Sequence, residues 1–591
     1  GPAVWAPRAQ CDRGLYRRAV RGLLERHQSL HTIQGTVARL LFDGERVAGV
    51  ETLEGRRFGA RAVVITTGTF LRGRIHIGTE TKVAGGRAGE AAATHLAEQL
   101  EAVGLTVARF KTGTPPRVDG RSVDWSRLER QESEVEAFDY SWSHFWETAR
   151  REGGWGMGDE LRPGSFASLR TGCPEALHPP SPIPLPLAAT RHPPQLPCWI
   201  TYLNEPGKRI IAENIGRSAM YGGAIASRGP RYCPSVEDKI VKFPAAERHQ
   251  LFLEPEGHDT SEMYVNGLST SLPAEVQLAV LRTVPGLERV RMTRAGYAIE
   301  YDYYPPTQLD ATLQVKALPG LWFAGQINGT TGYEEAAGQG VVAGLNAGLA
   351  ALGRPPLVLG RETSYVGVLV DDLTTRGVDE PYRLFTSRSE FRLTVRQDNA
   401  LRRLASVGAQ LGLYDAGELA LIGERFAAED EARALAERTS VRPEQAEALL
   451  RAAGSAPLAH AVKVVEVARR QGVGLRALFD AAGVGAELPD EAVTTAELEI
   501  KYAGYFARER VQADRLRRMG DFALPAGLPY AEMRSLSFEA RQKLAALEPR
   551  SLAQASRVPG VSPNDLQNLV LEVERWRRRR AGAGTGAGAA D

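Results

Sequence analysis

The sequence predicts an α/β fold followed by an all-α C-terminal region. Residues 62–68 form a largely apolar, β-branched run that ends in glycine, which is typical of a strand buried on both faces. Residues 321–340 predict a short strand, a glycine-containing turn and a helix of small residues. From about residue 351 onward the chain is rich in Ala, Leu, Glu and Arg, in a mostly helical pattern.

The N-terminal part predicts one helix and an antiparallel meander. Residues 12–27 place leucine and valine near helical spacing among arginines. Strand-like runs follow at 31–41, 46–53 and 61–67, and an Asp-Gly pair at 43–44 marks the first turn between them. The sequence GRAGEAAA at 86–93 predicts a second glycine-rich entry into a helix, which should end near Gly104.

Two later stretches differ in composition from the rest of the sequence, which has a globular pattern. Residues 141–197 contain three tryptophans, and nine prolines fall within 171–197, so regular structure is not expected there. We expect a surface excursion or a poorly ordered insertion. The Gly/Ala tail 581–591 is expected to be disordered.

Composition limits the possible classes of function. A chain of 591 residues predicts two to four domains, and 73 Lys+Arg against 71 Asp+Glu predict no global field for a polyanion. A nucleic-acid surface must therefore be a local patch. Four cysteines without CxxC or CxxH spacing argue against a zinc site or a disulfide framework. No membrane span or signal peptide is recognisable, which favours a soluble protein of the reducing cytoplasm.

The turn after residue 324 carries the clearest ligand-binding pattern. Backbone amides at a helix start are unpaired, and they suit an anion or an electron-rich ring. Gly325 allows a ligand to approach closely, and Gln326, Asn328 and Thr330 add polar groups. A tightly packed strand-turn-helix without a ligand is the alternative.

The segment 229–243 concentrates reactive residue types. Cys233 lies between Arg231 and a Pro-Ser helix start, with Glu237 and Asp238 in the first turn. A helix N-terminus and a guanidinium both favour the thiolate form of cysteine. The segment therefore favours a functional thiol, although a buried structural cysteine is the alternative.

Two shorter segments leave function and structure equally open. Lys111 and Arg117 flank an expected turn at 110–117 that suits phosphate or carboxylate contact, or only a proline-anchored loop. Glu300 and Asp302 lie in an apolar strand, where a carboxylate is an acid–base group or a structural hydrogen-bond acceptor.

Basic residues gather in the C-terminal half. In 380–396, arginines alternate with Tyr382, Phe385 and Phe391, a combination that single-stranded RNA recognition uses. A solvated helix with a core stripe is the alternative. A basic helix at 501–518 and a turn at 555–563 add weaker signals of the same kind. The candidate tRNA-binding residues in the first segment are Arg383, Arg388, Arg392 and Arg396.

Taken together, the motifs resemble one family. GPRYCPSVEDK, FLEPEG, NGLSTSLP, GYAIEYD, FAGQINGTTGYEEAAGQG, GVLVDDL and EPYRLFTSRSEFRL occur in this order. Over nearly the whole chain they resemble the MnmG (GidA) family of FAD-dependent tRNA uridine 5-carboxymethylaminomethyl modification enzymes. The resemblance implies a flavoprotein fold with two dinucleotide-binding domains. It implies an FAD-binding domain at 1–85 and 296–350, an inserted NAD/substrate domain at 86–295, a helical linker region at 351–490 and a tRNA/partner-binding helical domain at 491–580.

The resemblance also implies an activity. Members modify C5 of the wobble uridine of tRNA with FAD, NADH, methylenetetrahydrofolate, and glycine or ammonium. It implies a homodimer that forms a heterotetramer with the GTPase partner MnmE in the cytoplasm, without a membrane. The alternatives are the related folate- and FAD-dependent tRNA uracil-5-methyltransferase, and a flavin-deficient fragment that binds tRNA.

Individual site residues follow by similarity. Cys233 matches a cysteine proposed to act in catalysis, Gln326 beside Gly325 matches a flavin contact, and Val37 matches the position where backbone holds the adenine end. The stretch matched to NAD comprises Gly229, Pro230, Arg231, Tyr232, Cys233, Pro234, Ser235, Val236, Glu237, Asp238, Lys239, Ile240, Val241, Lys242 and Phe243.

Two departures from the family pattern accompany the resemblance. A GGGHAG-type pyrophosphate loop and a CNPA motif with a second functional cysteine would precede Gly1, so we expect a truncated start. Ala93 stands where the family has a flavin-contacting serine, and Thr94 is a possible substitute.

Overall fold

The structure is a computed structural model that describes residues 10–133, 195–227, 229 and 234–584. Most of the proline-rich stretch 141–197, Cys233, and residues 585–591 of the predicted disordered tail lie outside the described residues. The chain divides into two compact units. Of the described residues, the larger unit comprises those within 10–131, 197–391 and 512–584, and the smaller comprises those within 132–196 and 392–511.

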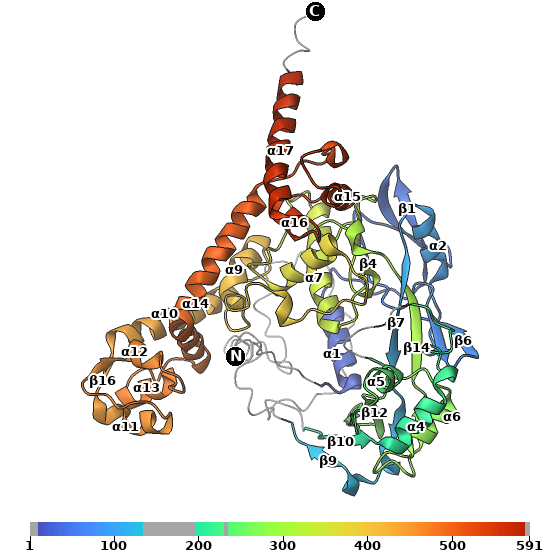
Figure 1. The fold of residues 1–591 in the computed structure, drawn as a ribbon, viewed down its shortest axis with the longest axis horizontal. Coiled ribbons are helices and arrows are strands. Elements are labelled where there is room, and N and C mark those ends of the chain that lie inside the picture. Colours follow the sequence, from blue (N-terminus) through green and yellow to red (C-terminus); the bar gives the residue numbers. More distant parts are fainter. Residues whose placement is uncertain (1–9, 134–194, 228, 230–233, 585–591) are drawn as a thin grey trace, which may run out of the picture. The chain divides into compact units, whose positions relative to one another are not determined.

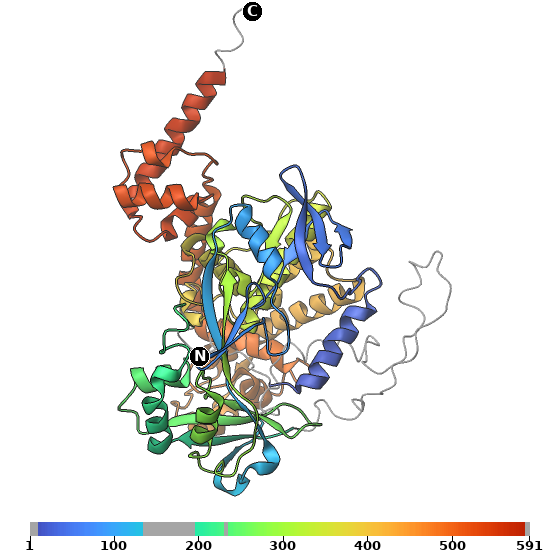
Figure 2. The ribbon, with the colours of Figure 1, turned by 90° about the vertical axis from the view of Figure 1, so that its right-hand side faces the viewer.

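The N-terminal meander of the larger unit is confirmed in part, since residues 31–36 are not strand and the third strand of the ladder lies at 57–59, where none was predicted. Helix α1 (Arg13–Arg26) begins after Asp12, whose carboxylate accepts the Leu15 amide at 2.8 Å. Strands β1 (Val37–Asp43), β2 (Arg46–Thr52) and β3 (Arg57–Gly59) form an antiparallel ladder, drawn in blue in Figure 2. Helix α2 (Thr94–Ala102) packs on β1, where the Gln99 side chain bonds both the amide and the carbonyl of Leu40.

The predicted buried strands pair with each other. Strand β4 (Val63–Ile65) runs parallel to β15 (Leu321–Phe323), and helix α7 (Tyr333–Ala351) packs against both (Figure 1). Trp322 and Phe323 are almost inaccessible and belong to one core with the ladder and α2. Burial on both faces explains why these strands are apolar throughout.

The described part of the larger unit also contains two antiparallel sheets. A four-stranded sheet has the order β6-β5-β14-β7, and β7 and β14 lie side by side over their whole length (Figure 1). A six-stranded sheet has the order β13-β8-β12-β11-β10-β9 and shares a core with α4, α5 and α6. The expected turn at 110–117 is instead mostly strand, because β7 continues to Thr114 and β8 begins at Arg117. The bounds are β5 (Arg74–Ile77), β6 (Thr81–Ala84), β7 (Ala108–Thr114), β8 (Arg117–Asp119), β9 (Glu129–Gln131), β10 (Cys198–Leu203), α4 (Glu205–Glu213), α5 (Val236–Lys242), β11 (His249–Pro255), β12 (Glu262–Asn266), α6 (Ala274–Leu281), β13 (Met292–Arg294) and β14 (Tyr297–Tyr303).

Helices dominate the remainder, as the composition predicted. In the larger unit they are α8 (Tyr365–Asp371), a π-helical turn η9 (Asp372–Arg376), and a C-terminal bundle of α15 (Phe538–Leu547), α16 (Leu552–Arg557) and α17 (Pro563–Gly584). The bundle has its own apolar core, and α17 extends into the stretch that was expected to be disordered.

The smaller unit is helical around a separate core. It departs from an all-α prediction only by a ladder of two-residue strands, within the part of the chain that the structure describes. Helix α14 begins in this unit and continues past its boundary. None of the described helices is long and apolar enough to cross a membrane. The bounds are α9 (Ala400–Leu411), α10 (Ala416–Arg438), β16 (Ser440–Val441), α11 (Pro443–Ala452), β17 (Val462–Lys463), α12 (Val464–Ala468), α13 (Leu475–Ala482) and α14 (Asp490–Asp521).

Candidate functional site

The carboxyl ends of β4 and β15 form the floor of the candidate site. The Ala324 amide donates to the Ile65 carbonyl at 3.0 Å, which brings the turns after both strands together. Gly68 and Gly325 begin these turns with φ of +57° and +88°, a region that favours glycine. Open sheets bind ligands at such strand ends.

Both glycines face open space. A Cβ at Gly68 would meet only the Gln326 side chain, at 3.7 Å, and one at Gly325 only Ala336, at 3.6 Å. The Thr67 hydroxyl beside them is buried without a hydrogen-bond partner among the described residues. Small residues, an unused polar atom and the Gln326 amide therefore line the same place, which fits a planar ligand with polar edges.

A buried glutamine holds the turn after β15. Gln339 of α7 is 0% exposed, and its carbonyl oxygen accepts the Gly325 amide at 3.2 Å and the Asn328 side-chain amide at 2.8 Å. Its own amide donates to the Thr330 hydroxyl and the Glu335 carbonyl. The turn is thus fixed by one side chain from the following helix, a residue that the sequence analysis did not single out.

A close packing contact fixes the far side of the same turn. Gly329 has φ of +78°, and a Cβ there would lie 2.7 Å from Val378 and 3.0 Å from Phe110. Phe110 stacks on Tyr303 with ring centroids 3.8 Å apart, so the turn rests on the four-stranded sheet. Only glycine suits this position without displacing its neighbours.

The arginine-rich segment meets the glycine turn directly. Tyr382 donates its amide to the Gly329 carbonyl at 2.8 Å, and Arg383 Nε donates to the buried Glu335 carboxylate at 3.0 Å. The Leu384 amide donates to the same oxygen at 2.7 Å. Two motifs that the sequence analysis treated separately are therefore parts of one structure.

Of the other residues matched to flavin, Val37 begins β1 and Ala93 precedes α2. Both pack against the core that contains Ala324 and Ile327. Ala93 is the N-cap of α2, and no side chain caps this helix. Thr94, the suggested substitute for the flavin-contacting serine, is the first residue of α2 and is exposed.

The described part of the segment matched to NAD forms the predicted helix start. Ser235 caps α5, with its hydroxyl accepting the Asp238 amide at 3.2 Å. Glu237 is 0% exposed, and one of its carboxylate oxygens accepts from Ser218, Thr270 and Ser271. Its other oxygen has no partner among the described residues. Pro230, Arg231, Tyr232 and the candidate catalytic Cys233 lie outside the described residues.

Lys111 reaches this segment from β7. A Cβ at Gly229 would lie 2.6 Å from Lys111 Cε and 3.1 Å from its ammonium. Burial lowers the pKa of Lys111, against the opposing effect of Asp238 and Glu237. A partly buried cation therefore faces the two carboxylates at the start of α5.

Other charged candidates have structural partners. Arg117 stacks over the Tyr264 ring at 4.6 Å and pairs with Glu256 at 3.3 Å. Asp302 is 1% exposed and pairs with Arg109 at 2.5 Å and Arg72 at 2.6 Å. Burial raises the pKa of Asp302 in spite of these arginines. The structural reading of Asp302 is therefore the one that the geometry favours.

The four candidate tRNA-binding arginines differ in accessibility. Arg396 is 3% exposed, pairs with Asp398 and Glu499, and lies over the Phe506 ring. Its burial contradicts the predicted direct contact with tRNA and gives this arginine a role in the core instead. Arg383 pairs with Glu334 and Glu335, and Arg388 lies over the Tyr382 ring at 4.2 Å. Arg392 is exposed. The expected aromatic stacking platform is also wrong for Tyr382 and Phe391, which are 5% and 3% exposed.

A more accessible basic surface adjoins Arg392 in the smaller unit. The amides of Leu393 and Thr394 donate to Glu509 of α14, which places Arg392 next to this helix. On α14, Arg508 lies 4.8 Å from the ring of Tyr505, a residue that is 56% exposed. The sequence analysis predicted a basic helix at 501–518 but missed the exposed tyrosine. No group of three or more His, Cys, Asp or Glu residues suited to a metal ion occurs among the described residues.

Three family models match the chain. One described as "Glucose inhibited division protein A" matches residues 1–152 and 181–355. Two described as the "tRNA modifying enzyme MnmG/GidA" C-terminal helical domain and C-terminal helical bundle match residues 420–510 and 512–590.

Curated relatives and solved structures agree with these matches. The "tRNA uridine 5-carboxymethylaminomethyl modification enzyme MnmG" of Parabacteroides distasonis is 42% identical over 583 residues, which are 97% of this chain and 86% of that protein. The enzyme of the same name from Geobacillus thermodenitrificans is 42% identical over 581 residues, 98% of this chain and 85% of that protein. The structure of Aquifex aeolicus GidA in its form II crystal matches with a TM-score of 0.79 and 38% identity, over 97% of this chain and 85% of that one.

Proposed function

Because the chain belongs to the MnmG/GidA family of tRNA uridine modification enzymes, we propose that it adds a carboxymethylaminomethyl or aminomethyl group at C5 of the wobble uridine of tRNA. FAD and NADH are the proposed cofactors, methylenetetrahydrofolate the one-carbon donor, and glycine or ammonium the amine. The observation that carries the proposal is that all three family models match a chain which has a glycine-lined site at the ends of β4 and β15.

The site supports FAD by its shape and by the polar groups that line it. Gly68 and Gly325 leave room for a flat ring, and the buried Thr67 hydroxyl and the Gln326 amide offer hydrogen bonds at its edge. FAD supplies two-electron redox chemistry at its ring when bound. Helix α7 begins at Tyr333 without a side-chain cap, so its first amides are available to favour negative charge at the site.

The segment 229–243 is proposed to hold NADH, with Cys233 as nucleophile or general acid toward the uracil ring. Support comes from the family match and from the partly buried Lys111 beside Gly229. Gly229, Glu237 and Asp238 place polar backbone and carboxylates near that cation. In this proposal Val37 holds the adenine end of FAD, and Ala93 lies where relatives use a serine.

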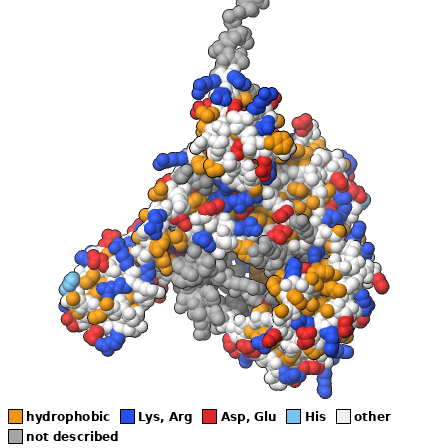
Figure 3. Space-filling view, viewed as in Figure 1, with side chains coloured by type: hydrophobic (Ala, Val, Ile, Leu, Met, Phe, Trp, Pro, Cys, Tyr) orange, Lys and Arg blue, Asp and Glu red, His pale blue; other side chains and the backbone are white. Residues whose placement is uncertain are grey.

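Single-stranded tRNA is proposed to bind along Arg392 and the exposed face of α14. Arginine neutralises phosphate and an exposed tyrosine stacks on unpaired bases, and Arg508 with Tyr505 offers both. Arg383 and Arg388, which belong to the larger unit, stay candidate tRNA contacts in this proposal. Figure 3 shows further Lys and Arg side chains gathered around α17, where Arg575, Arg577 and Arg578 are exposed.

The proposal includes a homodimer that forms a heterotetramer with a GTPase partner, MnmE, in the cytoplasm. These features rest on the family alone. A folate- and FAD-dependent uracil-5-methyltransferase is the weaker alternative, since the matches to the two C-terminal MnmG/GidA models favour the aminomethylating family. A flavin-deficient tRNA-binding fragment is the other alternative.

A pair of matched variants tests the flavin site. Gln339→Leu leaves the Gly325 amide unpaired, at a cost of about 1–3 kcal/mol in the free energy of unfolding, and removes one of the two acceptors of the Asn328 side-chain amide, which keeps the Phe323 carbonyl. Asn346→Leu on the same helix removes buried hydrogen bonds to Leu357 instead. We expect both variants to lose stability by thermal unfolding, but only Gln339→Leu to weaken FAD binding in a fluorescence titration. Equal FAD affinity in the two variants would contradict the assignment.

A further inference from the structure

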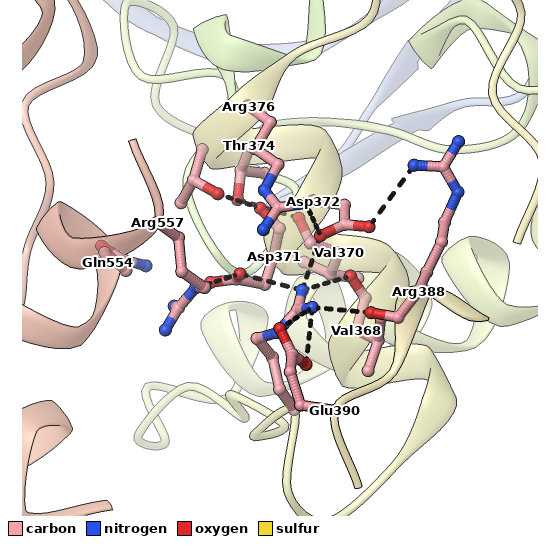
Figure 4. A network of polar contacts seen from close by, with 12 residues as sticks. Val368, Val370, Asp371, Asp372, Thr374, Arg376, Arg388, Glu390, Gln554 and Arg557 are labelled. Atoms are coloured by element: carbon pink, nitrogen blue, oxygen red, sulfur yellow. Dashed lines mark hydrogen bonds and ion pairs between the residues drawn. The ribbon is translucent and has the colours of Figure 1, made fainter. Parts of the chain in front are cut away.

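A buried arginine organises the segment between the flavin turn and the C-terminal bundle. Arg361 is 3% exposed, and its guanidinium donates to Asp372 at 2.6 Å, to Asp371 at 3.2 Å and to both oxygens of Glu390. It also reaches the carbonyls of Val368 and Arg388 (Figure 4). All its donor groups are used, which is what a buried guanidinium requires.

Asp371 connects this arginine to the C-terminal bundle. Its two carboxylate oxygens accept Nε and Nη2 of Arg557, the last residue of α16, and the Nε contact is 2.6 Å long (Figure 4). Both side chains of this pair are little exposed, at 12% and 11%. Paired geometry and burial make it stronger than an exposed surface pair.

Asp372 connects the same arginine to the flavin turn. Its second oxygen accepts the Tyr382 hydroxyl at 2.8 Å, and Tyr382 in turn donates its amide to the Gly329 carbonyl. Burial raises the pKa of Tyr382, as does the Asp372 carboxylate, so the hydroxyl remains a donor. Asp371 and Asp372 both bind the Arg361 guanidinium, but Asp371 also contacts the C-terminal bundle, whereas Asp372 contacts Tyr382 beside the flavin turn.

The local backbone adds a second observation. The chain passes from α8 into a π-helical turn at Asp372, and such turns are frequent at functional sites. Loss of Arg557 would leave Asp371 with Arg361 as its only ionic partner in this network. The contacts of Arg361 with Asp371, Asp372 and Glu390 would then shift. This shift would move the Asp372 carboxylate, which accepts the Tyr382 hydroxyl.

We propose that docking of the C-terminal bundle through Arg557 and Asp371 sets the position of the turn at 325–332. Asp371, Asp372 and Tyr382 are then positioning residues, which act on the flavin site through Gly329. The inference rests on the proposed function only in naming FAD as the ligand of that turn. Since coupling between sites is reciprocal, a ligand in the turn must also stabilise docking of the bundle.

Hydrogen exchange of the flavin-free full chain tests the coupling without reference to FAD. Arg557→Gln and Asp371→Asn are expected to speed exchange in peptides covering 325–332 and 380–384 by about two- to thirtyfold, the range of coupling energies between linked sites. The bundle keeps its own apolar core, so its internal helices should stay protected. If Arg557→Gln loses its fold, Arg557→Lys carries the same test, because it keeps the charge without the paired geometry.

Arg550→Gln is the matched control. Arg550 precedes α16 and pairs with Asp310 at 3.6 Å, and among the described residues it has no ion pair with Asp371 or Asp372. Its removal should leave exchange in the two peptides unchanged. Faster exchange confined to the bundle in Arg557→Gln, or an equal effect in Arg550→Gln, overturns the proposal.

Hydrogen exchange with added FAD distinguishes a failure of this inference from a failure of the proposed function. Added FAD should slow exchange around α16 in the wild-type chain and less so in Arg557→Gln. A wild-type chain that does not bind FAD contradicts the proposed function, while the flavin-free comparison still decides the coupling. A chain that binds FAD with equal affinity in wild type and Arg557→Gln contradicts the coupling alone.

Discussion

At the scale of single residues, buried polar groups mark where this chain departs from simple core packing. Gln339, Glu335 and Arg361 are all nearly inaccessible and bond to the turn or its neighbours, although one carboxylate oxygen of Glu335 has no partner among the described residues. Such groups cost stability unless they are paired, so their presence indicates that the turn must hold one conformation. For Glu335 and Gln339 the sequence offered one signal, which is a polar residue within a helix of otherwise small or apolar residues.

His76 predicts a specific pH dependence of stability. It is 0% exposed on β5, and neither ring nitrogen has a partner among the described residues. Burial lowers the pKa of His76 below its usual 6.5, and Arg74, Lys82 and Arg109 add to this effect against Glu300. Below about pH 6.5 the unfolded chain therefore binds a proton that the folded chain does not, so stability falls as the pH drops toward the folded-state pKa.

His76→Leu should flatten this dependence, by at most about 1.4 kcal/mol for each unit of pKa shift that is removed. The measurement is the free energy of unfolding by denaturant between pH 7.5 and about pH 5. His95→Leu, at an exposed position on α2, is the control and should keep the wild-type slope. An unchanged slope in His76→Leu would show that other groups cause the acid sensitivity.

At the scale of elements, the start of α2 is under-stabilised. Ala93 occupies the N-cap in an extended conformation, and no side chain accepts an amide of the first turn. A serine oxygen there would bond the amide of His95 or Leu96, and such caps contribute about 0.5–2 kcal/mol.

Ala93→Ser should therefore raise the melting temperature of the flavin-free chain. Ala92→Ser, one residue earlier, lies outside the cap position and should not. Since relatives are expected to use this serine toward flavin, added FAD should stabilise Ala93→Ser more than the wild type. Stabilisation by Ala92→Ser to the same extent would mean that capping is not the cause.

Elements with strong local signals could be predicted from the sequence. The meander, the Asp-Gly turn at 43–44, the strand at 321–323 and the capped start of α5 follow from periodicity and turn chemistry. The expected turn at 110–117 was wrong, because pairing with β14 extends β7 through Lys111 to Thr114. Strand pairing of this kind depends on a partner far away in the sequence, which no local pattern contains.

At the scale of the whole molecule, the sequence indicated the site's components but not their contacts. It did not predict that β4 pairs with β15, or that Tyr382 and Arg383 hold the glycine turn. Arg396 shows the same limit. Its spacing among other arginines suggested a nucleic-acid contact, whereas its partner Glu499 lies 103 residues further along the chain. Charge pattern alone does not distinguish a solvated arginine from a buried, paired one.

Two regions of the chain carry different parts of the proposed activity. The larger unit contains the flavin turn, Lys111 and the network around Arg361, and the smaller contains Arg392 and the Tyr505–Arg508 face. Phosphate contacts are weakened by salt, whereas a buried cofactor site is much less affected. tRNA binding should therefore fall with ionic strength while FAD affinity changes little.

The most direct test is nucleoside analysis of tRNA after reaction with the purified chain. The reaction contains FAD, NADH, methylenetetrahydrofolate, glycine or ammonium, and the GTPase partner with GTP, and unmodified tRNA is digested and examined by mass spectrometry. We predict a new aminomethyl or carboxymethylaminomethyl group on the wobble uridine, which is lost when FAD is omitted. Formation of 5-methyluridine instead, or binding of tRNA without any modification by a flavin-loaded chain, would contradict the account.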